Sequence, residues 1–264
     1  MTATTTIVQL TDTHIGPPGS LPYGVDTAAN LRRVMHSVAQ MSPAPDVVLL
    51  TGDLSDSGEP ESYDHLRQLI DEGLEPLGCP VLSVIGNHDL RPSFRRHFLG
   101  ERDLGHDLPY YYVHDLDSVR IVMCDSHVEG EVTGWLGPDQ LAWLDEQLAT
   151  AGDRSVVVAM HHPSVPRGVP KAHDHLLVDR DALAAVISLH DVEVVLCGHS
   201  HVSTAASFAG TLHVAAPSTA FLMDPFSYRG SARLDTIGYS ICTVRDGRAI
   251  VNPFVLEPEG AAPR

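Results

Sequence analysis

Side chains able to bind metal ions stand at five points of the sequence where a short hydrophobic run stops. The motifs are Asp12-Thr13-His14, Gly52-Asp53, Gly86-Asn87-His88-Asp89, His161-His162 and Gly198-His199-Ser200-His201. Carboxylate, amide and imidazole groups without thiolate suit borderline to hard cations. A structural zinc site would be richer in cysteine and closed by four ligands. The pattern therefore predicts a metal site that performs chemistry.

The candidate ligands outnumber what one ion needs. In chain order they are Asp12, His14, Asp53, Asn87, His161, His199 and His201. This set suits two divalent or trivalent ions, such as Mn²⁺, Fe²⁺/Fe³⁺ or Zn²⁺. A shared carboxylate is the simplest way to hold two cations ~4 Å apart, and Asp53 is the candidate for that bridge.

Two adjacent cations would support hydrolysis of a phosphate ester. They lower the pKa of a bridging water, and the resulting hydroxide attacks in line while the cations neutralise the phosphate oxygens. His88 is the candidate catalytic group beside them, because a protonated imidazole can stabilise developing charge or protonate the leaving alkoxide. Asn87 is a second catalytic candidate, and Asn87, His88 and His201 are the candidate contacts to substrate.

Each residue also has a structural interpretation. Asp12 could cap a turn, and Asn87 could be an ordinary turn residue. Either His161 or His162 could be the ligand at that strand end. Asp89 could orient the preceding histidine or simply cap a turn. The case for a metal site therefore depends on the five motifs together.

Length and composition bound the class of protein. The chain has 264 residues, 43% of them hydrophobic, which is enough for one domain with a large core. Acidic residues outnumber basic ones by 34 to 17, and the net charge of −17 disfavours nucleic-acid polymers and anionic membranes as partners. Four scattered cysteines favour free thiols in a reducing compartment. With no signal-like segment and no apolar run of ~20 residues, the sequence predicts a soluble, cytoplasmic protein.

Hydrophobic periodicity predicts the elements that position the motifs. Buried strands are expected at residues 4–10, 47–50, 81–85, 156–160 and 192–197, with helices between them, among them 26–41 and 138–149. Such alternation is typical of a mostly parallel sheet, whose ligand sites gather at the carboxyl ends of the strands. Antiparallel strands are expected at 211–216, 239–244 and 249–254.

We therefore predict an α/β fold in which two mixed β-sheets pack as a sandwich flanked by helices. The whole chain, 1–264, is expected to form a single domain. Strands from about residue 205 onward are expected to complete the second sheet. Two loops, at 163–179 and 221–238, could overhang the site.

In order and spacing, the motifs resemble those of the calcineurin-like metallophosphoesterase superfamily, D-x-H, G-D, G-N-H-[D/E], a lone His and G-H-x-H. The resemblance implies that one metal is bound by Asp12, His14, Asp53 and His201. It implies that the other is bound by Asp53, Asn87, His161 and His199, so that His161 rather than His162 is the ligand. His88 would be the non-ligating histidine beside the phosphate. Members with G-D-x-x-D also pair the second carboxylate with that histidine, which implies a catalytic role for Asp56.

The length and the motifs are most similar to those of bacterial class III cyclic-nucleotide phosphodiesterases. We therefore expect a metal-dependent diesterase for small phosphodiesters, with 3′,5′-cyclic nucleotides (cAMP or cGMP) the leading substrates. A glycerophosphodiesterase or a broad-specificity phosphoesterase is the alternative, and a non-catalytic scaffold is the alternative of another class. A protein phosphatase would carry arginine where Ser57 and Ile85 stand. Relatives are often homodimers, and the sequence leaves the oligomeric state open.

Overall fold

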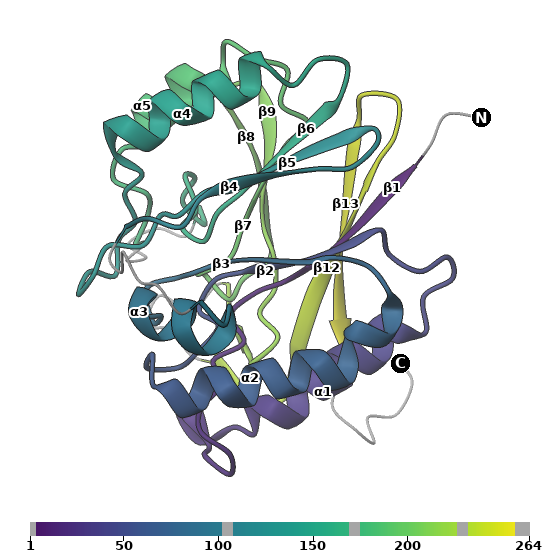
Figure 1. Ribbon diagram of the computed structural model, residues 1–264, viewed down its shortest axis with the longest axis vertical. Coiled ribbons are helices and arrows are strands. Elements are labelled where there is room, and N and C mark those ends of the chain that lie inside the picture. Colours follow the sequence, from purple (N-terminus) through teal and green to yellow (C-terminus); the bar gives the residue numbers. More distant parts are fainter. Residues whose placement is uncertain (1–3, 102–107, 169–174, 226–231, 257–264) are drawn as a thin grey trace.

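The structure is a computed structural model that describes residues 4–101, 108–168, 175–225 and 232–256. Two mixed β-sheets pack face to face, and helices cover both outer sides (Figure 1). The predicted fold class is thereby confirmed. The loops at 163–179 and 221–238 fall partly outside the described residues.

The first sheet has the strand order β13-β12-β1-β2-β3. Three of its strands run parallel, namely β1 (Thr5–Leu10), β2 (Val47–Thr51) and β3 (Val81–Val84). The other two are antiparallel, namely β12 (Ile237–Val244) and β13 (Ala249–Leu256). The outer side of this sheet carries helices α1 (Thr27–Ala39), α2 (Pro60–Gly73) and α3 (Arg91–Ser93) (Figure 1).

The second sheet has the strand order β4-β5-β6-β7-β9-β8. Its parallel strands are β5 (Val119–Met123), β6 (Ser155–Ala159), β7 (Val194–Cys197) and β9 (Thr211–Ala215). Antiparallel strands close its two edges, namely β4 (Tyr112–Asp115) and β8 (Thr204–Phe208). Helices α4 (Gly137–Ala149) and α5 (Arg180–Ile187) cover its outer side, and a small ribbon is formed by β10 (Leu222–Met223) and β11 (Ala232–Arg233).

The tail departs from the prediction in one respect. Strands β8 and β9 belong to the second sheet as expected, but β12 and β13 do not. They extend the first sheet instead, where Ile7 of β1 lies opposite Cys242 of β12. Hydrophobic alternation identifies a strand without identifying its partner, and β1 would otherwise leave a long unpaired edge.

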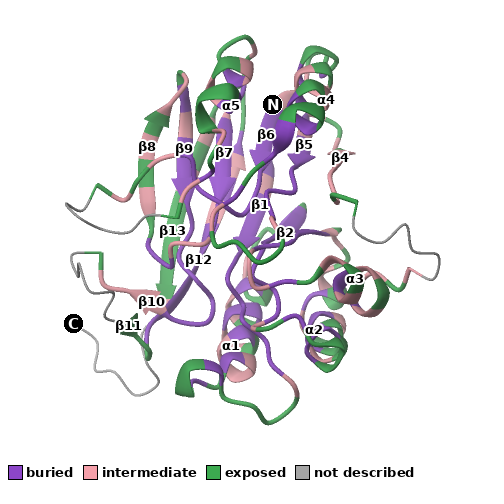
Figure 2. Cartoon of the chain, turned by 90° about the vertical axis from the view of Figure 1, so that its left-hand side faces the viewer, coloured by how far each residue is buried: buried purple, intermediate pink, exposed green. Residues whose placement is uncertain are grey.

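The hydrophobic core is divided into three layers. One lies between the first sheet and α1 and α2, one between the second sheet and α4 and α5, and the third between the two sheets. Figure 2 shows the central strands buried along most of their length. A core on both faces explains why these strands are hydrophobic runs rather than alternating sequences.

Local sequence sets where the first two helices begin. Asp26 caps α1 as predicted, because its carboxylate accepts a hydrogen bond from the amide of Ala29 at 2.8 Å. Pro60 starts α2, where its missing N–H and fixed φ cost nothing. Within the described residues, no helix is long and apolar enough to cross a membrane.

One buried side chain joins the two sheets next to the strand ends. The side-chain amide of Gln9, on β1, donates to Thr51 Oγ1 at 3.0 Å and to the carbonyl of Cys197 at 2.9 Å. Its partners are the last residues of β2 and of β7. The carboxyl ends of strands from both sheets are thus held at one edge of the sandwich.

Candidate metal centre

All seven candidate ligands lie at this edge, each directly after a strand or within a few residues of its end. They follow β1 (Asp12, His14), β2 (Asp53), β3 (Asn87), β6 (His161) and β7 (His199, His201). Five of them have left-handed backbone, with φ between 43° and 69°: Asp12, His14, Asp53, His199 and His201. Such conformations are uncommon outside glycine and concentrate at functional sites. They turn the chain so that Asp12 and His14, and likewise His199 and His201, can face the same cluster although they are two residues apart.

Asp53 occupies the middle of the cluster. Its Oδ2 lies 3.3 Å from His161 Nε2 and 3.7 Å from His14 Nε2, and its Oδ1 accepts a hydrogen bond from the amide of His88 at 2.9 Å. Burial alone would raise the pKa of this carboxyl, but the charges of His161 and His14 hold it well below its usual range. The geometry is that of a carboxylate between two sets of ligands.

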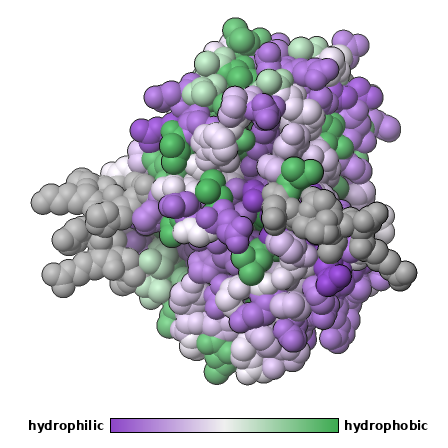
Figure 3. Space-filling model, turned by 60° about the vertical axis from the view of Figure 1, so that its left-hand side comes forward, coloured by the Kyte–Doolittle hydropathy of each residue, from purple (hydrophilic) through white to green (hydrophobic). Residues whose placement is uncertain are grey.

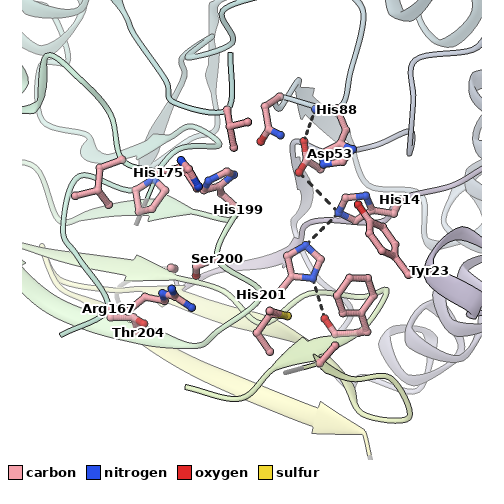
Figure 4. Close-up of a pocket in the computed structure, with 18 of the residues that line it drawn as sticks. His14, Tyr23, Asp53, His88, Arg167, His175, His199, Ser200, His201 and Thr204 are labelled. Carbon is pink, nitrogen blue, oxygen red and sulfur yellow. Dashed lines mark hydrogen bonds and ion pairs between the residues drawn. The ribbon is translucent and has the colours of Figure 1, made fainter. Parts of the chain in front are cut away.

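The first set contains Asp12, His14 and His201. His14 Nε2 lies 3.0 Å from His201 Nε2 (Figure 4). Asp12 Oδ1 lies 3.4 Å from the same nitrogen of His201. Burial is the main cause that lowers the pKa of His201, to about 4, so this imidazole is neutral at pH 7. A neutral imidazole that converges with a carboxylate is a ready ligand for a cation.

The second set lies on the other side of Asp53. His161 Nε2 is 3.3 Å from Asn87 Oδ1 and 3.3 Å from His199 Nδ1. Burial, followed by the charge of His161, lowers the pKa of His199 to about 3. The same burial would lower the pKa of His161, but the charge of Asp53 raises it to about 9.

In three of the four candidate ligand histidines, the second ring nitrogen is held by a neighbouring group. His161 Nδ1 donates to the carbonyl of Thr51 at 2.8 Å, and His201 Nδ1 donates to the carbonyl of Phe221 at 3.0 Å. His14 Nδ1 lies 3.2 Å from Asp56 Oδ1. Outer partners of this kind fix the tautomer of each imidazole, so that its Nε2 keeps a lone pair for a metal ion. The donor set therefore fits a pair of metal ions. The ligand atoms of Asp12, His14 and His201 lie within 4.8 Å of one another, and so do those of Asp12, Asp53 and His161.

The carboxylate of Asp56 was predicted to pair with His88, and this prediction is wrong. Its carboxylate contacts His14, while its main-chain carbonyl accepts from His88 Nδ1 at 2.7 Å. The residue reaches both rings because His14 and His88 are neighbours, with ring centroids 4.7 Å apart. His88 still lines the pocket, and its Nε2 is the nitrogen left for a substrate.

His162 and Asp89 each had two predicted roles, and the structure shows which groups surround them. His162 Nδ1 lies 2.8 Å from Ser126 Oγ, and burial lowers the pKa of this imidazole well below the usual value. One of its ring nitrogens nevertheless lies within 4.8 Å of ring nitrogens of His161 and His199. The carboxylate of Asp89 makes its hydrogen bonds to groups other than the His88 ring. Its buried carboxylate accepts hydrogen bonds from the amides of Gly86, Leu54 and Ser55 and from the hydroxyl of Tyr63. It therefore ties the loop after β3 to the loop after β2.

Glycines permit the close packing behind the ligands. A Cβ on Gly52, where φ is +90°, would lie 2.4 Å from His161 Nδ1. A Cβ on Gly86 would lie 2.3 Å from Asp53 Oδ1. Real Cβ contacts are not that short, so the G-D and G-N-H motifs need glycine for space as well as for backbone geometry.

An open pocket of about 410 Å³ lies over the cluster. Figure 4 shows His14, Asp53, His88, His199 and His201 along one part of its wall, with Arg167 and Thr204 at the far end. Sequence reasoning missed three lining side chains, namely Tyr23, Val132 and Thr204, whereas Val165, Arg167 and Met223 lie in the two loops that were expected to overhang the site. Only Tyr23 had a local signal, because it stands between Pro22 and Gly24 in a turn. On the face shown in Figure 3, hydrophobic side chains are scattered among hydrophilic ones.

A two-sheet sandwich with acidic and histidine side chains gathered at its shared edge suits a metal-dependent hydrolase. Residues 5–203 match the calcineurin-like phosphoesterase family, and the chain belongs to that family. The match includes every candidate ligand, from Asp12 to His201.

Curated relatives are similar in sequence, and a solved structure is similar in fold. The chain is 37% identical over 218 residues to a probable cyclic nucleotide phosphodiesterase of Rhodococcus erythropolis, covering 83% of this chain and 72% of that protein. It is 30% identical to a glycerophosphodiester phosphodiesterase of Enterobacter lignolyticus, covering 81% and 77%. A purple acid phosphatase from yellow lupin shares the fold, with a TM-score of 0.62 at 14% identity, over 98% of this chain and 55% of that one.

Proposed function

We propose that the protein is a dinuclear-metal phosphodiesterase for small diesters, with 3′,5′-cyclic nucleotides as its preferred substrates. The observation that carries the proposal is the position of Asp53, whose Oδ2 faces His161 Nε2 at 3.3 Å and His14 Nε2 at 3.7 Å. Asp12, His14 and His201 would hold one ion, and Asn87, His161 and His199 the other. Mn²⁺, iron or Zn²⁺ suits these ligands.

When bound, the two cations supply a nucleophilic water and neutralise phosphate charge. The chain's own groups position and complete the reaction. His88, held by the carbonyl of Asp56, turns its free Nε2 toward the pocket. In the protonated form this nitrogen donates to the leaving oxygen or to the charge that develops on the phosphoryl group. Asn87 and His201, which line or border the same space, contact the substrate phosphate.

Pocket charge favours diesters over monoesters. A monoester carries a second negative charge that needs a cationic partner. Arg167 is the one lysine or arginine among the described residues that line the pocket, and Figure 4 places it at the end away from His14 and Asp53. Arg91 is engaged elsewhere, since its Nε lies 2.9 Å from Asp125 Oδ2. A diester has no second charge to satisfy.

The size and lining of the pocket favour a nucleotide. A volume of about 410 Å³ is within the range of pockets that bind ligands of drug size. Apolar side chains from three parts of the chain, Val132, Val165 and Phe221, form much of its wall. They suit a ribose and base better than two glycerol units. The Rhodococcus relative supports the same choice, and the Enterobacter relative makes glycerophosphodiesters the competing substrate.

A substrate panel tests this proposal. Chelated protein would be reloaded with Mn²⁺ and assayed on cAMP, cGMP, a glycerophosphodiester, an aryl diester and the matching aryl monoester. We expect the highest kcat/KM for a cyclic nucleotide and a higher value for the aryl diester than for the monoester. A clear monoester preference would move the protein to the phosphatases, and a glycerophosphodiester preference would refute the cyclic-nucleotide assignment.

A further inference from the structure

Tyr23 has a backbone conformation that neither the ligand cluster nor a hairpin explains. Among the described residues, eight other than glycine have φ above zero. Five are candidate ligands, and Ala209 and Asp246 lie in the turns between β8 and β9 and between β12 and β13. The eighth is Tyr23, with φ 54° and ψ 18°. A bulky side chain is disfavoured there, and strain of this kind gathers at functional sites.

The strained turn, Pro22–Gly24, places the Tyr23 ring at the edge of the pocket. The ring meets His14 edge-on, with centroids 5.5 Å apart and planes at 89°, and it meets Phe221 at 5.0 Å and 61°. In Figure 4 its hydroxyl end is turned inward, toward His14 and Asp53. The two ring contacts fix the direction in which the hydroxyl points.

The Tyr23 hydroxyl is a donor without a partner of its own. The described part of the chain offers it no hydrogen bond, although the carboxylate of Asp53 lines the same pocket. His88 stands on another side of His14, with ring centroids 4.7 Å apart. The Tyr23 hydroxyl and the His88 imidazole are therefore donors on two sides of the candidate ligand His14. A phosphate bound over the cluster presents acceptor oxygens that His88 alone does not satisfy.

We infer that the Tyr23 hydroxyl donates a hydrogen bond to a non-bridging phosphoryl oxygen of the bound diester. This inference rests on the proposed function and adds a substrate-contacting residue to it. Charge-assisted hydrogen bonds to phosphate oxygens are among the stronger ones in proteins. His14 and Phe221 orient the hydroxyl in advance, so its hydrogen bond becomes stronger as charge develops on the phosphoryl group.

The test compares Tyr23→Phe with Tyr111→Phe. The first variant keeps the ring contacts and removes only the hydroxyl. The second makes the same change on a tyrosine outside the pocket. The ring of Tyr111 packs against Trp143, with ring centroids 4.6 Å apart. With Mn²⁺ loaded, we expect kcat/KM of Tyr23→Phe to fall roughly 10- to 100-fold, the range for losing a hydrogen bond to a charged group. Metal content and Tm should equal those of Tyr111→Phe.

Two further readouts make the assignment specific. Calorimetry with inorganic phosphate on the Mn²⁺-loaded protein should show weaker binding to Tyr23→Phe than to Tyr111→Phe. The loss of kcat/KM should be equal for an aryl diester and for a cyclic nucleotide, whose leaving alkoxide is far more basic. A much larger loss with the cyclic nucleotide would place the hydroxyl on the leaving oxygen and overturn the assignment.

Failure of this inference and failure of the proposed function look different. If the wild-type protein hydrolyses diesters and Tyr23→Phe stays within about twofold of Tyr111→Phe in turnover and phosphate binding, only the role of Tyr23 is refuted. If the wild-type protein hydrolyses no diester, the proposed function is refuted, and equal phosphate binding by the two variants would then refute the hydroxyl contact as well.

Discussion

Asp56 Oδ1 lies 3.2 Å from His14 Nδ1, so this carboxylate supports a candidate ligand and not the histidine beside the substrate. The contact orients the imidazole and leaves its Nε2 facing His201 and Asp53. A carboxylate behind a ligating histidine also makes the ring a better electron donor. Asp56 is therefore a positioning residue for the metal site.

Asp56→Asn should weaken metal binding rather than the chemical step. The loss of the charge behind His14 should lower Mn²⁺ affinity roughly 10- to 100-fold, the usual range for such outer partners. At saturating Mn²⁺, kcat should change little, because the main-chain carbonyl that holds His88 remains. Calorimetric titration of the chelated protein measures the affinity.

Asp64→Asn is the matched control for that titration. Asp64 pairs with His97 Nδ1 at 3.0 Å on the surface, away from the cluster. Equal Mn²⁺ affinity in the two variants, together with a large loss of kcat in Asp56→Asn, would restore the predicted Asp56–His88 pair.

Gly52→Ala should destroy the metal site through lack of space. The new Cβ would meet the ring of His161, at 2.4 Å from Nδ1, and φ of +90° is unfavourable for alanine. Gly19→Ala carries the backbone penalty alone, since φ is +82° and nothing lies within 4 Å of its Cβ. We expect Gly19→Ala to lose about 1 kcal/mol of stability at most and to keep metal and activity. Metal analysis that finds both variants fully loaded would contradict the packing argument.

His213 should make the protein sensitive to mild acid. It is buried on β9, its Nε2 accepts from the amide of Ser164 at 3.0 Å, and burial lowers its pKa from 6.5 to about 4. The unfolded chain binds a proton at this histidine before the folded chain does. Its stabilising effect is therefore complete above about pH 6.5 and is lost as the pH falls toward 4, at about 1.4 kcal/mol per pH unit.

His213→Gln removes this titration and keeps a hydrogen-bond acceptor. Urea denaturation between pH 6.5 and 4.5 should show a shallower loss of stability in His213→Gln than in His36→Gln, a change on the exposed side of α1. Parallel curves for the two variants would show that His213 does not contribute to the acid sensitivity.

The sequence predicted the elements and the candidate ligands because both have local signals. Buried strands appear as short hydrophobic runs, and each run that stops on Asp, Asn or His marks a strand end. The partner of a strand has no such signal, which is why β12 and β13 were assigned to the wrong sheet. The same holds for side-chain pairing: the spacing of Asp53 and Asp56 shows that both lie near the site, but not which ring Asp56 faces.

Long-range contacts were beyond the reach of sequence patterns. Asp89 was expected to orient His88 or to cap a turn, yet three hydrogen bonds from two loops and a fourth from Tyr63 on α2 converge on its carboxylate. Tyr23 is nearly 200 residues from Phe221 in the chain, and only the fold shows that the two rings meet. Positive φ at a tyrosine cannot be inferred from its neighbours, although Gly24 marks the turn.

Asp53 is proposed to be shared by two metal ions that act together on a diester. The direct measurement is a titration of chelated protein with Mn²⁺, in which bound metal per chain and cAMP hydrolysis are recorded on the same samples. Wild-type protein should bind two ions per chain and gain its activity as the second one binds, whereas Asp53→Ala should retain neither tightly. Full cAMP hydrolysis by the metal-free protein, or by a sample with a single ion per chain, would contradict the account.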